Sequence, residues 1–283
     1  MEEVSPASGA CYVISDVHGH LADLLAGLRG HGLLDEGGHW SGGEARLWFL
    51  GDLTDRGPDG LGVIDLVRRL GTEAAADGGR CEVLLGNHEV LLLGARHFGD
   101  RPFQGRTGVA TSFLGLWLRN GGRPSDLAGL DQDRIDWLSG LPAMAREGGH
   151  LLVHADSTAY LEYGRTVEAV NDAVRTVLAA ADIHAWRDCF SRLTRRFAFR
   201  GEEGPQQVGE VLAVFGGDRL VHGHSPIPVL LDRFGPADLD GQREPELGGA
   251  LVYAAGLALA VDGGRGTEDA EGRLLIVRLP EPV

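Results

Sequence analysis

Short apolar runs alternate with amphipathic stretches along the first third of the chain. The apolar runs predict strands, and they lie at 11–16, 45–52 and 81–87. The stretches that follow them carry apolar residues at helical spacing, and they lie at 20–34, 61–71 and 88–98. Strands that alternate with helices in this way indicate βαβ units around a sheet with parallel members.

The alternation stops in the segment 99–149, which is rich in glycine and proline turns. Its pattern predicts one helix at 107–120 and a shorter one at 133–141. We interpret this segment as a helical insertion or cap. Trp117 and Trp137 occupy apolar helical positions there, so we expect them in the core rather than as a stacking platform for a nucleobase.

The remainder of the chain returns to strands. The pattern predicts a strand at 150–156, mostly helix at 166–199 and a surface loop at 235–249. Further short apolar runs without helices between them lie at 219–225, 228–234, 250–256, 257–264 and 272–279. These runs predict a second, more antiparallel sheet layer. We therefore expect one α/β catalytic domain over residues 1–283 that contains the insertion.

Composition points to an ordinary soluble globular protein, with 43% hydrophobic and 24% charged residues in 283. No apolar run approaches the roughly 20 residues that span a bilayer, and the start MEEVSPASGA lacks the features of a signal peptide. We therefore expect a cytoplasmic protein. Cys11, Cys81 and Cys189 form no CxxC pair, so we expect small buried side chains rather than disulfides or a zinc site.

The formal net charge is −15, which disfavours binding to nucleic acid polymers or anionic membranes. All 26 basic residues are arginine. No lysine is therefore present to act as a nucleophile or to bind phosphate in a Walker-type loop.

Polar side chains follow five of the predicted strands, at the end of the sheet where ligands of α/β proteins collect. They are Asp16, His18, Asp52, Asn87, His88, His154 and His224. Carboxylate, imidazole and amide ligands suit Mn, Fe or Zn, and a pair of ions needs a bridging carboxylate, for which Asp52 is the candidate. Taken singly, each residue has an alternative role as a helix cap or as a buried histidine.

The stretches SDVHG, GDLTDRG and GNHE contain several of these residues, in this order and spacing. Together they resemble the signature blocks of the calcineurin-like metallophosphoesterase superfamily. The close match of the last two resembles its phosphoprotein phosphatase branch, which includes bacterial Ser/Thr phosphatases and dinucleoside tetraphosphatases. The later HAD, GHS and VDGG are similar to its remaining blocks. The resemblance implies a four-layer α/β/β/α sandwich with two divalent metal ions, Mn²⁺ being the preferred candidate and Fe, Zn or Ni the alternatives.

The resemblance also implies a role for each matching residue. The first ion would be held by Asp16, His18 and Asp52, and the second by Asp52, Asn87, His154 and His224. His88 would be the general acid, with Asp55 orienting it, and Arg56 would bind the substrate phosphate. We expect Asp55 to favour the protonated, charged form of His88.

Other positions depart from the family pattern or extend it. Asp156 stands where the family usually has glycine, and this carboxylate would either add a metal ligand or repel an anionic substrate. A second arginine for phosphate is expected, with Arg187 and Arg200 as candidates, although each could simply pair with a nearby acid. His222 lies on the same face of its strand as His224, and we expect it to support the metal ligands rather than bind the metal.

The leading functional hypothesis is hydrolysis of phosphomonoesters, including phosphoserine and phosphothreonine proteins, by hydroxide formed at a metal pair. The close alternative is hydrolysis of a dinucleoside polyphosphate such as diadenosine tetraphosphate. A further alternative is a sensor that binds metal or nucleotide without catalysis. The presence of Asp52, Asp55, Arg56 and His88 together argues against the sensor.

Overall fold

The computed structural model describes residues 9–105, 108–239, 241–244, 247–266 and 272–280. Most of the N-terminal stretch from which we predicted the absence of a signal peptide lies outside these residues. Among the described residues, no helix is both long enough and apolar enough to cross a membrane. The three cysteines are free and buried, as expected.

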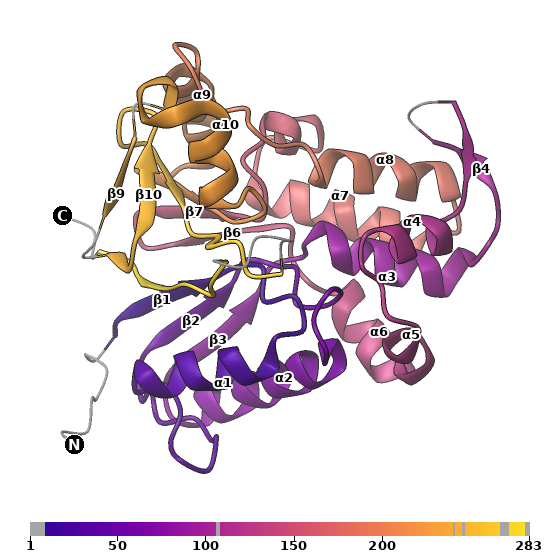
Figure 1. Ribbon diagram of the computed structural model, residues 1–283, viewed down its shortest axis with the longest axis horizontal. Helices are drawn as coiled ribbons and strands as arrows, with labels where there is room; N and C mark the ends of the chain where they lie inside the picture. Colours follow the sequence, from indigo (N-terminus) through magenta and orange to yellow (C-terminus); the bar gives the residue numbers. More distant parts are fainter. Residues whose placement is uncertain (1–8, 106–107, 240, 245–246, 267–271, 281–283) are drawn as a thin grey trace.

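The first sheet has the strand order β12-β1-β2-β3. Its strands are β1 (Cys11–Ile14), β2 (Arg46–Phe49), β3 (Arg80–Val83) and β12 (Ile276–Arg278). The first three are parallel, and the intervening helices α1 (Leu21–Gly30) and α2 (Gly60–Ala76) cover the outer face of the sheet (Figure 1). The predicted βαβ units are confirmed. The strand β12 pairs antiparallel with β1, although its sequence predicted a place in the second sheet.

The second sheet has the order β6-β7-β8-β11-β10-β9. Its strands are β6 (Met144–Glu147), β7 (His150–Val153), β8 (Arg219–His222), β9 (Gln242–Glu244), β10 (Ala250–Tyr253) and β11 (Ala258–Ala260). The three central strands β7, β8 and β11 are parallel, and the outer strands are antiparallel. The antiparallel character that we predicted is therefore confined to the outer strands.

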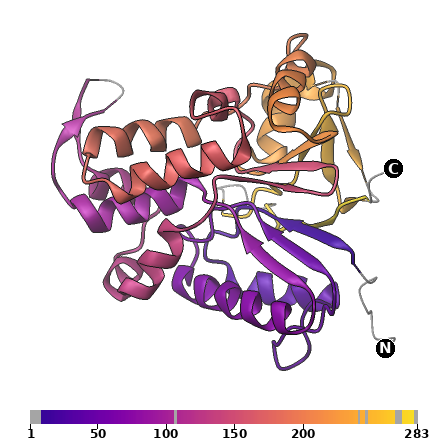
Figure 2. The ribbon, with the colours of Figure 1, turned by 180° about the vertical axis from the view of Figure 1, so that it is seen from behind.

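Helices α9 (Gly204–Phe215) and α10 (Ile227–Leu239) lie against the outer side of this second sheet, which completes the predicted α/β/β/α sandwich (Figures 1 and 2). The prediction of a strand at 228–234 is wrong, because this stretch lies in α10. Its apolar residues fall at Ile227, Leu230, Leu231 and Phe234, which is the i, i+3, i+4, i+7 spacing of a helix face.

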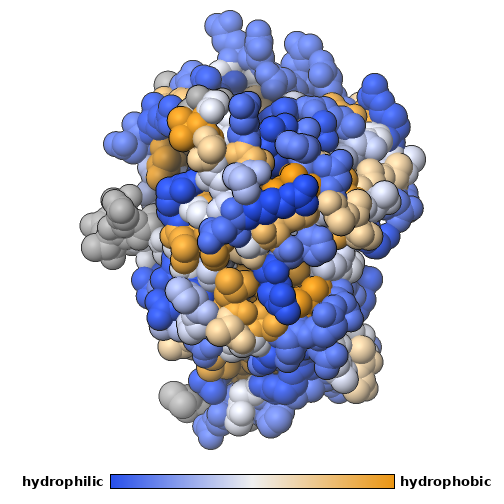
Figure 3. Space-filling model, turned by 90° about the vertical axis from the view of Figure 1, so that its right-hand side faces the viewer, coloured by the Kyte–Doolittle hydropathy of each residue, from blue (hydrophilic) through white to orange (hydrophobic). Residues whose placement is uncertain are grey.

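The helices of the insertion form a second group at one side of the sandwich, together with the helix that precedes them and the long helices that follow them (Figure 1). These helices are α3 (Asn87–Phe98), α4 (Phe113–Arg119), α5 (Pro124–Gly129), α6 (Gln132–Ser139), α7 (Val167–Ala179) and α8 (Ile183–Leu193), with a short 3₁₀ turn, η1, at Thr158–Glu162. The outer face of this group presents apolar side chains between charged ones (Figure 3). Val109 and Leu118 are its exposed large apolar residues among the described parts of the chain.

The insertion differs from its prediction at both ends. The strands β4 (Phe103–Gln104) and β5 (Ala110–Thr111) pair in a region where we predicted the start of a helix, whose Thr107 lies outside the described residues. Helix α4 begins only at Phe113, because the Ser112 side chain accepts a hydrogen bond from Gly115 N and caps it. At the other end, residues 144–147 form the edge strand β6 rather than part of a cap.

A buried acid at the end of the edge strand β6 joins the two sheets. The Glu147 carboxylate accepts hydrogen bonds from Trp48 Nε1 at 3.0 Å, from Arg46 at 2.5 Å and from Arg80 at 3.0 Å. Trp48 and Arg46 belong to β2, whereas Glu147 belongs to β6. The sandwich therefore holds its two sheets in a fixed relation, which matters because residues from both sheets meet at the candidate metal centre.

Candidate metal centre

The loops after β1, β2 and β3 run side by side and bond to one another through their backbones. Asp16 N donates to Gly51 O, and His18 N donates to Asp52 O at 2.9 Å. Nine described non-glycine residues have positive φ, and six of these lie at this centre: Asp16, His18, Asp52, Asp55, Arg56 and His224. Such a backbone is disfavoured for ordinary side chains, and it persists at functional sites where the surrounding structure enforces it.

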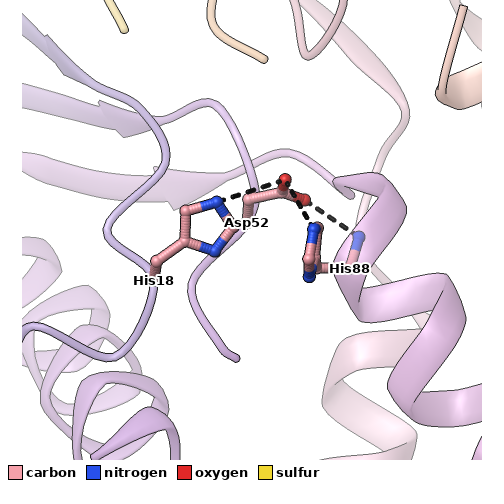
Figure 4. Close-up of side chains that lie close together, drawn as sticks. All are labelled: His18, Asp52 and His88. Carbon is pink, nitrogen blue, oxygen red and sulfur yellow. Dashed lines mark hydrogen bonds and ion pairs between the residues drawn. The ribbon is translucent and has the colours of Figure 1, made fainter. Parts of the chain in front are cut away.

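Asp52 lies at the middle of the assembled side chains. Its Oδ2 is 3.8 Å from His18 Nε2, and its Oδ1 is 3.4 Å from His154 Nε2. Oδ1 also accepts a hydrogen bond from the backbone N of His88 at 2.9 Å (Figure 4). One carboxylate therefore faces histidines from both sheets, as a bridging ligand must.

Backbone carbonyl groups orient the histidine rings. Nδ1 of His18 lies 2.9 Å from Thr54 O, and Nδ1 of His154 lies 2.7 Å from Leu50 O, so Nε2 of each ring faces Asp52. Nε2 of His224 lies 3.2 Å from Thr194 O, which leaves its Nδ1 for a ligand. Metal-binding histidines are held in this way, by a hydrogen bond from the nitrogen that does not bind the metal.

Potential ligand atoms gather into two groups, and each group lies within 4.8 Å. Asp52 belongs to both groups, with His18 and His88 in one and His154 and His224 in the other. The remaining predicted ligands lie beside them. Asp16 Oδ1 is 3.8 Å from His18 Nε2, and Asn87 Oδ1 is 2.9 Å from His154 Nε2. The six predicted ligands are thus brought together, while their division between two ions stays a prediction.

The electrostatics of the centre favour a bound cation. Burial raises the pKa of Asp52 well above its usual value, and the charges of Asp16 and Glu89 raise it further. Burial and the charge of Asp16 raise the pKa of Asp262 in the same way. Burial likewise lowers the pKa of His18 and keeps its ring neutral. Neutral imidazoles beside crowded carboxylates are the donor set that a divalent metal ion needs.

His88 and Asp55 form a buried pair beside these ligands. His88 Nδ1 lies 2.7 Å from Asp55 Oδ2, and His88 Nε2 lies 3.2 Å from a guanidinium nitrogen of Arg56. Other surroundings of His88 outweigh the effect that we expected from Asp55. Burial lowers the pKa of His88 well below its usual value and Arg56 lowers it further, while burial raises the pKa of Asp55 to about 7. Neutral His88 therefore donates from Nδ1 and accepts from Arg56 at Nε2.

The second arginine for phosphate stays a prediction. Arg187 donates to Asp188 at 2.7 Å, and Arg200 lies over the ring of Phe234. Burial lowers the pKa of His88, of His154 and of His224, and the charge of Arg196 lowers each of them further, which makes Arg196 an additional candidate. In the sequence, Arg196 is one of several arginines near the end of a helical stretch, and nothing there distinguishes it.

Asp156 and His222 lie behind the centre. The fully buried Asp156 carboxylate accepts hydrogen bonds from Ser225 Oγ at 2.5 Å and from Phe197 N at 2.8 Å. Its two carboxylate oxygens therefore accept hydrogen bonds from two segments, one that follows Arg196 and one that precedes α10. His222 Nε2 lies 2.7 Å from the Tyr253 hydroxyl, which fits the supporting role that we expected.

Comparison with known proteins agrees with this geometry. The family model for calcineurin-like phosphoesterases matches residues 11–228, which cover SDVHG, GDLTDRG, GNHE, HAD, GHS and every predicted metal ligand, whereas VDGG lies beyond them. The chain belongs to the calcineurin-like phosphoesterase family. The predicted resemblance and fold class are thereby confirmed.

Similar curated proteins within this family carry two kinds of description. Two are symmetrical bis(5'-nucleosyl)-tetraphosphatases. The one from Bordetella parapertussis is 34% identical over 170 residues, which are 56% of this chain and 48% of that protein. The one from Methylococcus capsulatus is 33% identical over 62% of this chain and 52% of that protein. The Shewanella-like protein phosphatase 2 of Arabidopsis thaliana is 33% identical over 28% of this chain and 20% of that protein. The chain thus spans about half the length of the tetraphosphatases that it matches.

Solved phosphoesterase structures share the fold. The cold-active protein-tyrosine phosphatase of a psychrophilic Shewanella species superposes with a TM-score of 0.66 at 21% identity, over 98% of this chain and 77% of that one. A protein serine/threonine phosphatase from Saccharomyces cerevisiae gives a TM-score of 0.52 at 15% identity, over 98% and 81%. At these identities the likeness concerns the fold alone.

Proposed function

We propose that the protein is a metal-dependent phosphoester hydrolase that acts on phosphomonoesters. The observation that supports this most strongly is the pair of buried ligand groups that share the Asp52 carboxylate. Their donors are carboxylate and imidazole, which suit Mn²⁺ and related ions, and Mn²⁺ is the ion that we propose to test first. The chemistry that a divalent metal pair supplies in such a site is activation of water near neutral pH.

Two arginines support the assignment to phosphomonoesters. Arg56 lies 3.2 Å from His88 Nε2, and we propose Arg196, whose neighbour Phe197 donates to Asp156, as the second arginine. Guanidinium groups bind phosphoryl oxygens through paired hydrogen bonds and stabilise the charge that develops during transfer. The phosphoryl group of a monoester carries two negative charges, whereas an internal phosphate of a polyphosphate chain carries one. Two arginines together with divalent cations therefore match the charge of a monoester better.

His88 is the residue that we assign as general acid. Its Nδ1 is held by Asp55, so Nε2 is the atom that exchanges a proton with the leaving oxygen. Nε2 accepts a hydrogen bond from Arg56. A phosphate that binds Arg56 draws this cation away from Nε2, which favours protonation of His88 when substrate is present.

A dinucleoside polyphosphate is the second candidate substrate. It is favoured by the 34% identity to a symmetrical tetraphosphatase over 56% of the chain. The matched stretches surround the phosphorus and the metal ions, which both substrate classes share. A panel of p-nitrophenyl phosphate, its bis-ester, phosphopeptides and diadenosine tetraphosphate, assayed with Mn²⁺-loaded protein, separates them. We expect the highest kcat/KM for a monoester, whereas a preference for diadenosine tetraphosphate would reverse the choice.

Two variants test the roles within the centre. His88→Ala should keep its metal and lose about 10²–10⁴-fold in kcat, since general acid catalysis contributes about this much. Asp52→Asn should lose metal as well as turnover, because Asp52 belongs to both ligand groups. Metal content by elemental analysis, measured beside kcat, checks both. Equal loss of metal in the two variants would contradict the roles, and metal binding without hydrolysis of any ester would favour a non-catalytic sensor.

A further inference from the structure

The helical insertion contacts the catalytic loop through a buried tryptophan. Trp117 of α4 has no exposed surface, and its Nε1 donates a hydrogen bond to Asp55 Oδ1 at 2.7 Å. The other oxygen of the same carboxylate, Oδ2, is the one bonded to His88 Nδ1. The Asp55 carboxylate thus accepts one hydrogen bond from the indole of Trp117 and one from the imidazole of His88, each at a different oxygen.

The turn after α4 holds the neighbouring residue of the same loop. Gly121 O accepts a hydrogen bond from Arg56 N at 2.8 Å. Gly121 has φ +94°, and a Cβ there would lie 2.7 Å from Arg56 Cγ, so the contact requires glycine. A Cβ at Gly122 would lie 2.2 Å from the Trp117 ring, which shows how closely this turn packs on the indole.

Helix α4 also packs directly on α3, the helix that begins with Asn87 and His88. At their contact Gly94 of α3 faces Phe113 of α4, and a Cβ on Gly94 would lie 2.4 Å from that ring. The insertion therefore touches both members of the pair Asp55 and His88, one through a hydrogen bond and the other through its helix.

We propose that Trp117 is a positioning residue for the general acid His88. We also propose that the insertion holds Asp55 and His88 in place on the side of the leaving group. The inference rests on the proposed phosphoester hydrolysis. In that reaction a water oxygen bonds to phosphorus and loses a proton to solvent, the bond from phosphorus to the leaving oxygen breaks, and that oxygen takes a proton from His88 Nε2. Trp117 and Asp55 exchange no proton with the substrate. Their part is to fix the imidazole so that Nε2 points at the leaving oxygen.

The position of Trp117 in this chain of contacts predicts a dependence on the leaving group. A poor leaving group such as the phenoxide of phenyl phosphate needs the proton from His88, whereas p-nitrophenoxide departs with little help. Trp117→Phe keeps the aromatic ring and removes the N–H. We expect kcat for phenyl phosphate to fall about 10–100-fold, and kcat for p-nitrophenyl phosphate to fall less than about threefold. Loss of core packing alone would reduce kcat for both substrates by the same factor.

The chain offers a matched control in Trp186. It is also buried, and it packs on Phe98 and Phe113 near α4, but its Nε1 donates to Ala180 O, remote from Asp55. Trp186→Phe should therefore leave the ratio of kcat for phenyl phosphate to kcat for p-nitrophenyl phosphate unchanged. The double variant Trp117→Phe/Asp55→Asn should be no slower on phenyl phosphate than Asp55→Asn alone, because Trp117 acts through Asp55.

The experiment measures kcat for both esters in the Mn²⁺-loaded wild type and in each variant, beside metal content and melting temperature. Trp117→Tyr supplies the same test should the phenylalanine variant not fold. Equal losses for the two esters, or the same ratio in the Trp186 control, would overturn the inference while the proposed function stands. An inactive wild type would overturn the proposed function and this inference with it.

Discussion

Asp156 stands where the resembled family usually has glycine, and it has no exposed surface. Besides its two carboxylate bonds, its backbone carbonyl accepts a hydrogen bond from Ala198 N at 3.1 Å. The segment held in this way includes Phe197, whose φ is +68°. Arg196 directly precedes Phe197, so Asp156 fixes the backbone next to this arginine.

Replacing Asp156 by glycine, the residue that is usual in the family, should therefore weaken substrate binding. For Asp156→Gly we expect unchanged metal content and a KM for phosphomonoesters about tenfold higher, a loss of about 1.4 kcal/mol, because hydrogen bonds to charged groups contribute about this much. Asp156→Asn, which keeps an oxygen acceptor, should change KM less. Steady-state kinetics and metal analysis check both. A lower KM would instead support repulsion of the substrate by Asp156, and loss of metal in Asp156→Asn would support a ligand role.

At this scale the sequence predicted the residues of local motifs and failed for isolated ones. His18, Asp52 and Asn87 sit at fixed distances from the ends of strands, so strand order alone brings them together. Arg196 lies in no such motif. The next residue, Phe197, donates a hydrogen bond to Asp156, which is 41 residues away in the sequence, and no local pattern predicts a contact over that separation.

Helix α3 begins at the metal centre, and a single side chain links its first turn to the end of β2. The fully buried Glu89 carboxylate accepts hydrogen bonds from the backbone N–H groups of Gly86 at 2.9 Å, Asp52 at 2.9 Å and Leu53 at 2.8 Å. The acid therefore satisfies the free donor at the start of α3 and also fixes the backbone that carries Asp52.

Glu89→Gln should destabilise this junction, because an amide places its own N–H groups among three donors. We expect the free energy of unfolding to fall by about 1–3 kcal/mol, the cost of an unsatisfied buried donor. Metal affinity should fall about 10–100-fold, as it does when residues that orient ligands are changed. Urea unfolding and metal titration measure the two effects, with the exposed Glu82→Gln as control. Wild-type metal affinity in a destabilised Glu89→Gln would confine Glu89 to a folding role.

Elements with a clear period were predicted well, and short mixed stretches were not. Helix α2 follows a long amphipathic pattern and appears where expected. Helix α10 and the paired strands β4 and β5 were missed. In α10 the apolar run of Val229, Leu230 and Leu231 after Pro228 resembled a strand, because the helical spacing of Ile227, Leu230, Leu231 and Phe234 was not recognised. The two strands in the insertion have only two residues each, which is too short for any periodicity.

The whole molecule assembles its centre from two sheets, and this explains both the success and the limit of the prediction. The βαβ order determines the first sheet, since crossovers between parallel strands leave few arrangements. The second sheet mixes parallel and antiparallel strands, and β12 crosses back to pair with β1. No local pattern identifies the partner of a short strand, so the resemblance to a family supplied the four-layer architecture that periodicity alone did not.

The fold buries several acids around its metal centre, and the stability of the metal-free protein should reflect this. Burial raises the pKa of Asp55 from 3.8 to about 7, although the hydrogen bond from Trp117 and the charge of Arg56 lower it. Between pH 3.8 and about 7, Asp55 is therefore protonated in the folded protein and ionised in the unfolded chain. The folded state then binds more protons, so the free energy of unfolding decreases as pH rises through this window and levels off above it.

Asp55→Asn removes this titration and isolates its contribution. We expect the variant to gain stability relative to the wild type as pH rises from about 4 to about 7, by at most about 4 kcal/mol, since one pKa unit corresponds to about 1.4 kcal/mol. Urea unfolding of both proteins in the presence of a chelator, at pH steps across the window, measures the difference. A constant or shrinking difference for Asp55→Asn would mean that Asp55 is already ionised in the fold, held so by Trp117 and Arg56 against the effect of burial.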